Sequence, residues 1–347
     1  MDVFVVAGNF RLDGQPVSCK PFGNGHINST YCLTTTEGTR YVLQKINTDI
    51  FGDPQGLMAN AVGVTEHIRQ RGGRAMTFIP TLAGEYCDED GWRVSAFEEG
   101  LCLEAVQSAD DFYQSGLAFG QFQQALSDYP AHTLHETIAD FHNTPVRFAQ
   151  LKAAVAESAD GRLDRCRQEL EYALSLESLG GRLQAMREQG ELPLRVTHND
   201  TKLNNVLLDP QTHTPLCVLD LDTVMPGLVA YDFGDAIRFG AATAAEDEQD
   251  PSKMKLDMAL FEAFSRGFLA GAPSLTDLEV QTLPLGAFTM TLECGIRFLA
   301  DYLRGDTYFR IAYPEHNLVR ARTQLALCAD MLYRWEDMTA VMKGIGR

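Results

Sequence analysis

Hydrophobic and polar positions in the first hundred residues follow two different periods. Short runs rich in β-branched and aromatic residues, typical of strands, occupy Ile27–Thr34, Tyr41–Ile46 and Trp92–Phe97. Gly56–Gln70 instead has helical spacing and ends at Gly72-Gly73, with apolar residues at Leu57, Ala61, Val64 and Ile68. Residues 1–100 are therefore predicted to form an antiparallel sheet with one helix.

The pattern after residue 104 is mostly helical. Helical periodicity is found around 108–126, 133–142, 160–190, 253–271, 283–304 and 316–340. One compact stretch differs, because three strand-length pieces, Leu194–Thr197, Asn205–Leu208 and Leu216–Leu221, bracket a dense set of polar residues. We expect an α+β fold with two domains, 1–100 and 104–347, joined near 97–103, and we expect chemistry in the polar stretch.

Composition limits the partners of this chain. Its 347 residues are 45% hydrophobic, enough for a sizeable core, and 29 Lys+Arg against 47 Asp+Glu give a formal net charge of −18. Such a surface repels nucleic-acid phosphates and anionic lipid, so neither partner is expected. A bound nucleotide would need a local positive arrangement and a divalent cation such as Mg²⁺. The acidic segment Ala241–Pro251 is interpreted as a solvated loop.

Cysteine usage and the N-terminal residues indicate a cytoplasmic protein. The eight cysteines are scattered, with no CxxC pair and no Cys/His cluster at ligand spacing, so we interpret them as isolated thiols. The apolar run Val3–Ala7 lacks the basic start and the length of a signal peptide. No run approaches the 18 apolar residues that a membrane span needs. The sequence carries no signal for a particular oligomeric state.

The segment His198–Asn205 has the strongest chemical signature of the chain. Its sequence, HNDTKLNN, matches the H-x-D-x-x-x-x-N spacing of a kinase catalytic loop and lies between two apolar strand-like runs. Phosphoryl transfer needs a carboxylate to orient the acceptor hydroxyl and an oxygen ligand for the metal. Asp200 is the candidate catalytic base and Asn205 a candidate metal ligand. The alternative is a polar turn in which Asp200 caps a helix.

About twenty residues further on, an apolar strand ends in two carboxylates, Asp220 and Asp222. Buried carboxylates are costly unless a cation or hydrogen bonds compensate them, which favours a metal here. This stretch resembles the aminoglycoside phosphotransferase/choline kinase superfamily, because Asp220, Gly227 and Asp232 match its second motif. The resemblance implies a two-lobe protein-kinase-like fold, with Asp220 as metal ligand and Asp232 as a structural residue rather than the metal-binding Asp of a DFG motif.

Longer strings resemble the bacterial N-acetylhexosamine 1-kinases within that superfamily. They are GHINSTY at 25–31, HNDTKLNNVL at 198–207, LDLDTVMPG at 219–227, YDFGDAIR at 231–238 and CGIRFLADYL at 294–303. The likeness extends over nearly the full chain. It implies that the acceptor is a small sugar bound by His26, Asp222, Thr223, Arg297 and Asp301.

Several residues of the first hundred are candidate nucleotide ligands. Gly23 and Gly25 precede a strand-like run, where small residues let backbone amides approach phosphates. Lys45 ends the second strand-like run and offers a cation for the phosphates, with Glu66 on the following helix as its ion-pair partner. The superfamily usually has its cation one position earlier, at Gln44, so the register of these two positions stays open.

Two further positions have roles that the sequence leaves partly open. Glu98 follows the third strand-like run and resembles the hinge whose backbone binds adenine. Arg297 lies in a strongly apolar helical segment, so it either binds ligand or pairs with Asp301 four residues later. The negative net charge does not separate a neutral sugar from a polyamine acceptor.

The leading hypothesis is ATP- and Mg²⁺-dependent phosphorylation of the anomeric 1-hydroxyl of an N-acetylhexosamine, GlcNAc or GalNAc. The same machinery acting on an aminoglycoside, choline or another small alcohol is the enzymatic alternative. A nucleotide-binding pseudokinase is the alternative of another class, although the base, both metal ligands and a candidate Lys are present. A protein kinase is less favoured, since no Ala-Pro-Glu segment follows Asp220.

Overall fold

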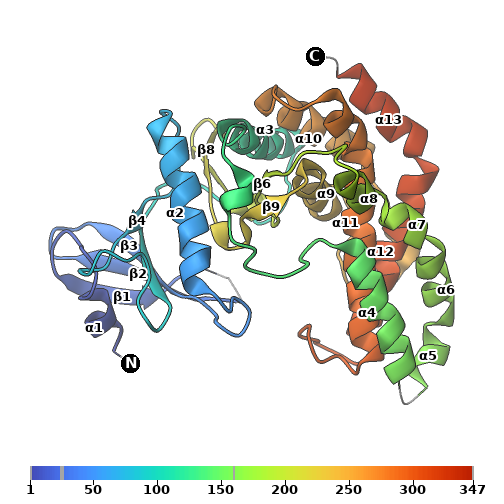
Figure 1. Cartoon of the computed structure of the whole chain (residues 1–347), viewed down its shortest axis with the longest axis horizontal. Helices are drawn as coiled ribbons and strands as arrows, with labels where there is room; N and C mark the ends of the chain where they lie inside the picture. The colour runs from blue at the N-terminus through green and yellow to red at the C-terminus, as the bar shows by residue number, and fades with distance from the viewer. Residues whose placement is uncertain (1, 24–26, 159–160, 346–347) are drawn as a thin grey trace. The chain divides into compact units, whose positions relative to one another are not determined.

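A computed structural model describes residues 2–23, 27–158 and 161–345 of the chain (Figure 1). The chain forms two compact units. Unit 1 comprises the residues up to Cys102 together with Ala125–Ala139 and Asn205–Pro226, and unit 2 comprises Leu103–Gln124, Asp140–Asn204 and the residues from Gly227 onward. Two segments of the predicted second domain, 125–139 and 205–226, thus belong to the unit built on the first hundred residues.

The sheet of unit 1 is antiparallel throughout, as predicted. Its strand order is β1-β2-β3-β5-β4, with bounds β1 (Pro16–Pro21), β2 (Ser29–Thr35), β3 (Arg40–Lys45), β4 (Phe78–Ile79) and β5 (Trp92–Ala96). The short helix α1 (Val3–Ala7) contributes to a core on one face, formed by Val6, Ala7, Phe10, Leu33, Tyr41, Leu43, Trp92 and Val94. Because strand side chains alternate, Gln44 of β3 and Arg93 of β5 lie on the opposite face.

Helix α2 (Pro54–Gln70) is the predicted helix of unit 1 and begins two residues before the predicted segment. The Asp53 side chain caps it by accepting a hydrogen bond from Gly56 N at 2.9 Å, and Pro54 occupies the first turn, where its missing N–H costs nothing. The Sδ atom of Met58 lies 3.8 Å from Arg93 Nη1. Helix α2 therefore contacts the sheet face that carries Gln44 and Arg93.

A hairpin of β7 (Val206–Leu208) and β8 (Pro215–Val218) completes unit 1. Leu101 and Leu208 exchange two backbone hydrogen bonds of 2.8 Å, which tie the hairpin to the segment after β5. The short elements of this region are the 3-10 helices η1 (Ala131–Thr133), η2 (Leu203–Asn205) and η3 (Leu221–Thr223) and the strand β9 (Met225–Gly227).

The prediction of a helix at 133–142 is wrong. After η1 the segment is irregular, and several of its backbone groups bind side chains. The Asn60 amide donates to the carbonyl of His135 at 2.8 Å and accepts from its N–H at 2.8 Å. Asp140 then adopts a left-handed φ of 53°, which a continuing helix excludes.

Unit 2 is predominantly helical and centres on the 27-residue helix α11. Helices α4, α9 and α12 pack along it (Figure 1). Its N-terminus has a capping box between Thr276 and Glu279. The helices of this region are α3 (Ala109–Ala125), α4 (Thr144–Glu157), α5 (Arg162–Arg165), α6 (Arg167–Ser175), α7 (Glu177–Gly180), α8 (Arg182–Glu188), α9 (Val229–Gly240), α10 (Met258–Gly271), α11 (Asp277–Leu303), α12 (His316–Tyr333) and α13 (Trp335–Gly344).

Most predicted helices of the second half are present, with three differences. The segment predicted as helical around 160–190 forms four short helices, α5 to α8, rather than a long one, and neither α4 nor α9 was predicted. The strand β6 (Arg195–Thr197) precedes the candidate catalytic loop, as predicted. The segment 241–251 is a loop up to the 3-10 helix η4 (Pro251–Lys253).

Two glycines bring α9 and α11 into backbone contact. A Cβ on Gly286 would lie 2.2 Å from the carbonyl oxygen of Ala230, and one on Gly234 would lie 2.3 Å from that of Gly286. Such distances are far below van der Waals contact, so only glycine fits at either position. Helix α9 is thereby seated directly on the central helix of unit 2.

All eight cysteines lie in the described ranges, and no disulfide joins any two of them. Among helices of the described chain, none combines the length and the apolar character that a membrane crossing requires.

Candidate active site

The candidate catalytic loop of unit 2 is held by a buried carboxylate on α9. Asp232, with no exposed surface, accepts hydrogen bonds from His198 N at 2.9 Å and from Asn199 N at 2.7 Å. A third bond comes from Gln123 Nε2 at 2.7 Å, and the same nitrogen also donates to the carbonyl of Val196 on β6. The carboxylate thus fixes the loop backbone just before Asp200, which agrees with the structural role that the sequence suggests for Asp232.

A second carboxylate of α9 holds the loop just after Asp200. Asp235 accepts from Thr201 N at 3.0 Å and pairs with Arg238 at 3.0 Å. Burial alone would raise the pKa of Asp235, but the neighbouring cations of Arg238 and Lys202 outweigh it, and the pKa lies below its usual range. Asp235 is therefore ionised at neutral pH and anchors the loop as a carboxylate.

Asp200 itself stays accessible. Its side chain is 26% exposed, and its Oδ1 atom lies 2.7 Å from the Nζ atom of Lys202. Burial would lower the pKa of Lys202, but the Asp200 carboxylate outweighs that effect and raises it, so Lys202 remains charged at neutral pH. The loop therefore presents one reachable carboxylate beside a permanent cation.

The β7–β8 hairpin of unit 1 brings Asn205 and Asp220 to the same end. Asn205 directly precedes β7, Asp220 follows β8 by two residues, and Leu219 N donates to the carbonyl of Asn205 at 2.8 Å. Asn205 is 8% exposed and Asp220 is exposed. An amide oxygen and a carboxylate at one site are a donor set that suits a hard divalent cation.

Two residues of these segments have left-handed backbone conformations. Asn199, next to the candidate base, has φ of 65°, and Asp220 has φ of 55° and ψ of 65°. Asn and Asp tolerate this region better than other non-glycine residues, and such conformations cluster at functional sites. Asn199 is 5% exposed and its amide donates to the carbonyl of Thr197 at 3.4 Å, whereas Asp220 is exposed.

Asp222 belongs to a buried polar network of unit 1. Its Oδ1 atom lies 2.5 Å from Arg93 Nη1, with side chains 5% and 4% exposed, and its Oδ2 atom accepts from Asn28 Nδ2 at 2.6 Å. Arg93 Nε donates to Gln44 Oε1 at 3.1 Å. Asp222 and Arg93 thus compensate each other's charge, while Thr223 lies at the end of η3 and its contact with substrate stays a prediction.

Lys45 and Glu66 are not brought together. Lys45 Nζ lies 5.6 Å from the ring centroid of Trp92, on the face of the sheet that bears the α1 core, whereas the Glu66 carboxylate contacts the hydroxyl of Tyr86 at 3.4 Å. Both residues are within the described chain, and they form no ion pair with each other. Gln44, not Lys45, faces the network that contains Asp222.

The remaining candidate nucleotide ligands have mixed outcomes. Gly23 has a left-handed φ of 79°, with no atom within 4 Å of an added Cβ. Gly25 and His26 lie outside the described residues. Glu98 follows β5 and pairs with Arg74 at 2.9 Å, which raises the pKa of Arg74. Binding of nucleotide by these residues stays a prediction.

Residues 18–270 of the 347 match the phosphotransferase enzyme family, described by the abbreviation APH. The chain belongs to this family. The matched range includes the candidate catalytic loop, the β7–β8 hairpin and the whole of α9. It therefore contains Asp200, Asn205 and Asp220 and the residues that hold them. We refer to the protein below as the phosphotransferase.

Solved structures with the same fold are kinases of small molecules. An amicoumacin kinase in complex with AMP-PNP and Ca²⁺ is 14% identical, with a TM-score of 0.63 over 93% of this chain and 92% of the other. A microcompartment-associated aminopropanol kinase is 16% identical, with 0.62 over 97% and 99%. An aminoglycoside phosphotransferase from Alicyclobacillus acidocaldarius is 16% identical, with 0.62 over 98% and 95%. The phosphotransferase therefore has their mixed α/β kinase-like fold.

The acceptor candidates on α11 of the phosphotransferase do not pair with each other. Asp301 is 5% exposed and accepts four hydrogen bonds of 2.8 to 3.0 Å, from Thr307 N, Tyr308 N, Phe309 N and Asn317 Nδ2. Arg297 instead lies over the rings of Tyr308 and Phe309, 6.0 and 5.4 Å from their centroids. Asp301 thus holds the loop that carries these rings, Arg297 packs against the rings, and binding of a ligand by Arg297 stays a prediction.

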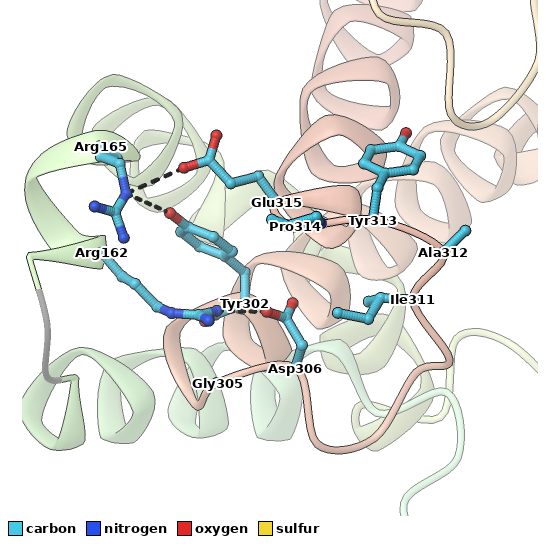
Figure 2. A pocket seen from close by; sticks show the side chains of 10 residues that line it. All are labelled: Arg162, Arg165, Tyr302, Gly305, Asp306, Ile311, Ala312, Tyr313, Pro314 and Glu315. Atoms are coloured by element: carbon cyan, nitrogen blue, oxygen red, sulfur yellow. Dashed lines mark hydrogen bonds and ion pairs between the residues drawn. The ribbon is translucent and has the colours of Figure 1, made fainter.

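An open pocket of about 590 Å³ lies elsewhere in unit 2 (Figure 2). Figure 2 shows that its two guanidinium groups point to carboxylates in the same pocket: Arg162 pairs with Asp306 at 2.5 Å and Arg165 with Glu315 at 3.1 Å. None of the predicted site residues lines it. The pocket therefore does not mark the residues that the sequence selects for chemistry.

Sequence reasoning missed three residues of these networks. Arg93 left a readable signal, because a lone charge within the apolar strand Trp92–Ala96 must be compensated when buried. Asp235 lies within the string YDFGDAIR at 231–238, but no catalytic motif places a carboxylate at that position. Gln123 had no signal, since it is one of several glutamines near the end of α3.

Proposed function

We propose that the phosphotransferase transfers the γ-phosphoryl group of ATP to the anomeric 1-hydroxyl of an N-acetylhexosamine. The observation that carries the reaction type is Asp200, an accessible carboxylate on a loop whose backbone is fixed on both sides by the buried carboxylates of Asp232 and Asp235. Such rigid positioning is what phosphoryl transfer requires of the protein.

Asp200 acts on the acceptor. Its carboxylate accepts the proton of the acceptor hydroxyl while the hydroxyl oxygen bonds to the γ-phosphorus, and the bridging oxygen to the β-phosphorus leaves with ADP. Lys202, charged and 2.7 Å away, keeps the carboxylate oriented. Asn205 and Asp220 would hold a divalent cation such as Mg²⁺, which supplies charge neutralisation at the phosphates when bound.

A neutral acceptor fits the α11 residues better than a cationic one. An aminoglycoside, choline or an amino alcohol carries positive charge and needs an acidic or aromatic lining without competing cations. Arg297 places a guanidinium beside Tyr308 and Phe309. The carboxylates one turn away on either side make internal contacts, Glu293 with His142 and Thr144 and Asp301 with the loop. A donor-rich cation next to aromatic rings suits sugar hydroxyls and an acetamido carbonyl.

The choice of N-acetylhexosamine rests on the strings GHINSTY, LDLDTVMPG and CGIRFLADYL, which carry the candidate sugar ligands His26, Asp222, Thr223, Arg297 and Asp301. In the structure Asp222 and Asp301 make the internal contacts described above, so Arg297 and Thr223 are the acceptor ligands to test first.

ADP release with ATP and Mg²⁺, scanned over GlcNAc, GalNAc, glucose, galactose, choline, aminopropanol and kanamycin, tests the proposal. We expect turnover of the N-acetylated sugars, with phosphate on the anomeric oxygen. Asp200→Asn should lower kcat about 10²- to 10⁴-fold, the usual contribution of a general base. Asp164→Asn, a substitution of a carboxylate that is 76% exposed, is the matched control. Normal turnover by Asp200→Asn would exclude the mechanism, and turnover of choline or kanamycin alone would exclude the sugar.

A further inference from the structure

The buried ion pair between Arg93 and Asp222 has no part in the proposed function so far. Arg93 is 3% exposed and Asp222 4%, and two charges removed from water to this degree are costly to bury. A pair of well-packed apolar residues would often be at least as stable, so an ion pair at such a position favours a role beyond stability.

The location of this pair is the second observation. Kinases take a cation for the nucleotide phosphates from the strand equivalent to β3 and pair it with a carboxylate. Here the residue of β3 on the α2 face is the uncharged Gln44, whereas Lys45 points to the Trp92 side. In the strand register Gln44 lies directly opposite Arg93 of β5, and their side chains are hydrogen-bonded at 3.1 Å. The cation on this face thus comes from the neighbouring strand.

The guanidinium of Arg93 is incompletely used. Its Nε binds Gln44 and its Nη1 binds Asp222, with the Met58 sulfur at 3.8 Å. Across the described ranges of the chain, Nη2 has no hydrogen-bonding partner. Because Nη2 is not among the fully enclosed side-chain atoms without a partner, it is accessible enough to donate to a bound group.

We propose that Arg93, paired with Asp222, is the cation that binds the nucleotide phosphates of this enzyme, with Nη2 donating to a phosphate oxygen. This inference rests on one part of the proposed function, the use of ATP as the phosphoryl donor, and does not depend on the identity of the acceptor. The arginine–aspartate pair of β5 and η3 replaces the lysine–glutamate pair that the sequence suggested for Lys45 and Glu66. Asp222 then orients Arg93 and is not a sugar ligand, and it links the phosphate cation to Asp220 two residues earlier.

Nucleotide binding separates this role from a purely structural one. Dissociation constants are measured for ADP and for adenosine, with Mg²⁺, by calorimetry on the full-length protein. Arg93→Gln should weaken ADP binding about 10- to 100-fold, the scale of a lost charged hydrogen bond, and change adenosine binding less than about threefold, because adenosine has no phosphate. Arg11→Gln removes an exposed guanidinium of the same unit and is the matched control.

Two further variants complete the test. In Gln44→Lys/Arg93→Gln the cation returns to β3 at the register-paired position, and ADP affinity should recover at least about fivefold. Since Arg93→Gln leaves Asp222 buried without its partner and can fail to fold, Arg93→Gln/Asp222→Asn removes both charges and should show the same selective loss of ADP affinity. Lys45→Gln tests the competing assignment.

Equal loss of ADP and adenosine affinity, no loss of either, or a larger loss of ADP affinity in Lys45→Gln would each overturn the proposal. These results differ from a failure of the proposed function. If the wild-type protein binds ADP but phosphorylates no acceptor, the acceptor chemistry is wrong and Arg93 can still be tested. If the wild-type protein turns over sugar while Arg93→Gln binds ADP normally, only the role of Arg93 is wrong.

Discussion

Asp232→Asn is the substitution that best tests how the catalytic loop is held. The side chain keeps its shape but loses one acceptor oxygen. In the wild type, Oδ2 accepts from His198 N and Gln123 Nε2, and Oδ1 accepts from Asn199 N, all within a site without exposed surface. Either orientation of the new amide therefore turns an NH₂ group toward at least one backbone N–H.

The cost follows from these contacts. Removing one acceptor from a buried N–H costs about 1–3 kcal/mol, and the amide NH₂ that replaces it points at that N–H donor, which adds a comparable amount. We expect the free energy of unfolding to fall by about 2–4 kcal/mol. We also expect kcat to fall more than KM rises, because the displaced segment, His198-Asn199, directly precedes Asp200 while Asp200 itself is unchanged.

Urea unfolding and steady-state kinetics with ATP and GlcNAc measure both effects. Asp164→Asn, which removes an exposed i,i+3 ion pair, should change the free energy of unfolding by less than about 0.5 kcal/mol. A wild-type kcat in Asp232→Asn would refute the reasoning that the buried carboxylate positions the base. A loss of kcat with unchanged stability would instead indicate that Asp232 takes part in the chemistry.

Two further predictions concern the supports of the site. Glu279 is 1% exposed and is paired with Arg195 of β6. Burial would raise the pKa of Glu279, but the bonds from Arg195 and Thr276 outweigh burial and lower it. The stabilisation from this carboxylate is therefore present above pH about 4.5 and is lost as the pH falls through the lowered pKa. Glu279→Gln should therefore lose about 3 kcal/mol at pH 7 and less at pH 3, measured by urea unfolding; equal losses at both pH values would contradict this. Asp301→Asn should speed exchange of the amides of residues 307–309 about 10- to 100-fold in hydrogen-exchange mass spectrometry, with the 241–250 loop as internal reference, and unchanged exchange would show that Asp301 does not hold that loop.

Periodicity predicted the elements whose side chains face two clearly different environments. Strands β2 and β3 and helix α2 each bury one face more than the other, and their patterns are plain in the sequence. Strand β5 is buried on both faces, and its apolar and β-branched residues indicated it instead. Helix α4 was missed although Asn143 caps it and Pro145 lies in its first turn, a start signal that should have been used. The segment 133–142 has apolar spacing, but Asn60 binds the backbone of His135, and no local pattern predicts such a distant partner.

The candidate site divides in the same way. The loop His198–Asn205 and the carboxylate Asp220 follow fixed spacings, so local sequence was sufficient to select them. The pairing of Arg93 with Asp222 joins residues 129 positions apart, and the choice between Gln44 and Lys45 depends on which face of β3 meets α2. Local sequence does not fix these contacts, because register and sheet orientation decide them.

The glycine contact between α9 and α11 has a consequence for altering acceptor choice. Helix α9 carries the two carboxylates that hold the candidate catalytic loop, and α11 carries Arg297, the proposed acceptor ligand. A side chain at Gly234 or Gly286 would separate the two helices and displace both groups. A directed-evolution library that randomises these helices would mostly return inactive proteins. Tyr308 and Phe309 are better positions to diversify, because Asp301 holds their loop through backbone N–H groups. Their side chains can therefore be replaced without displacing α9 or α11.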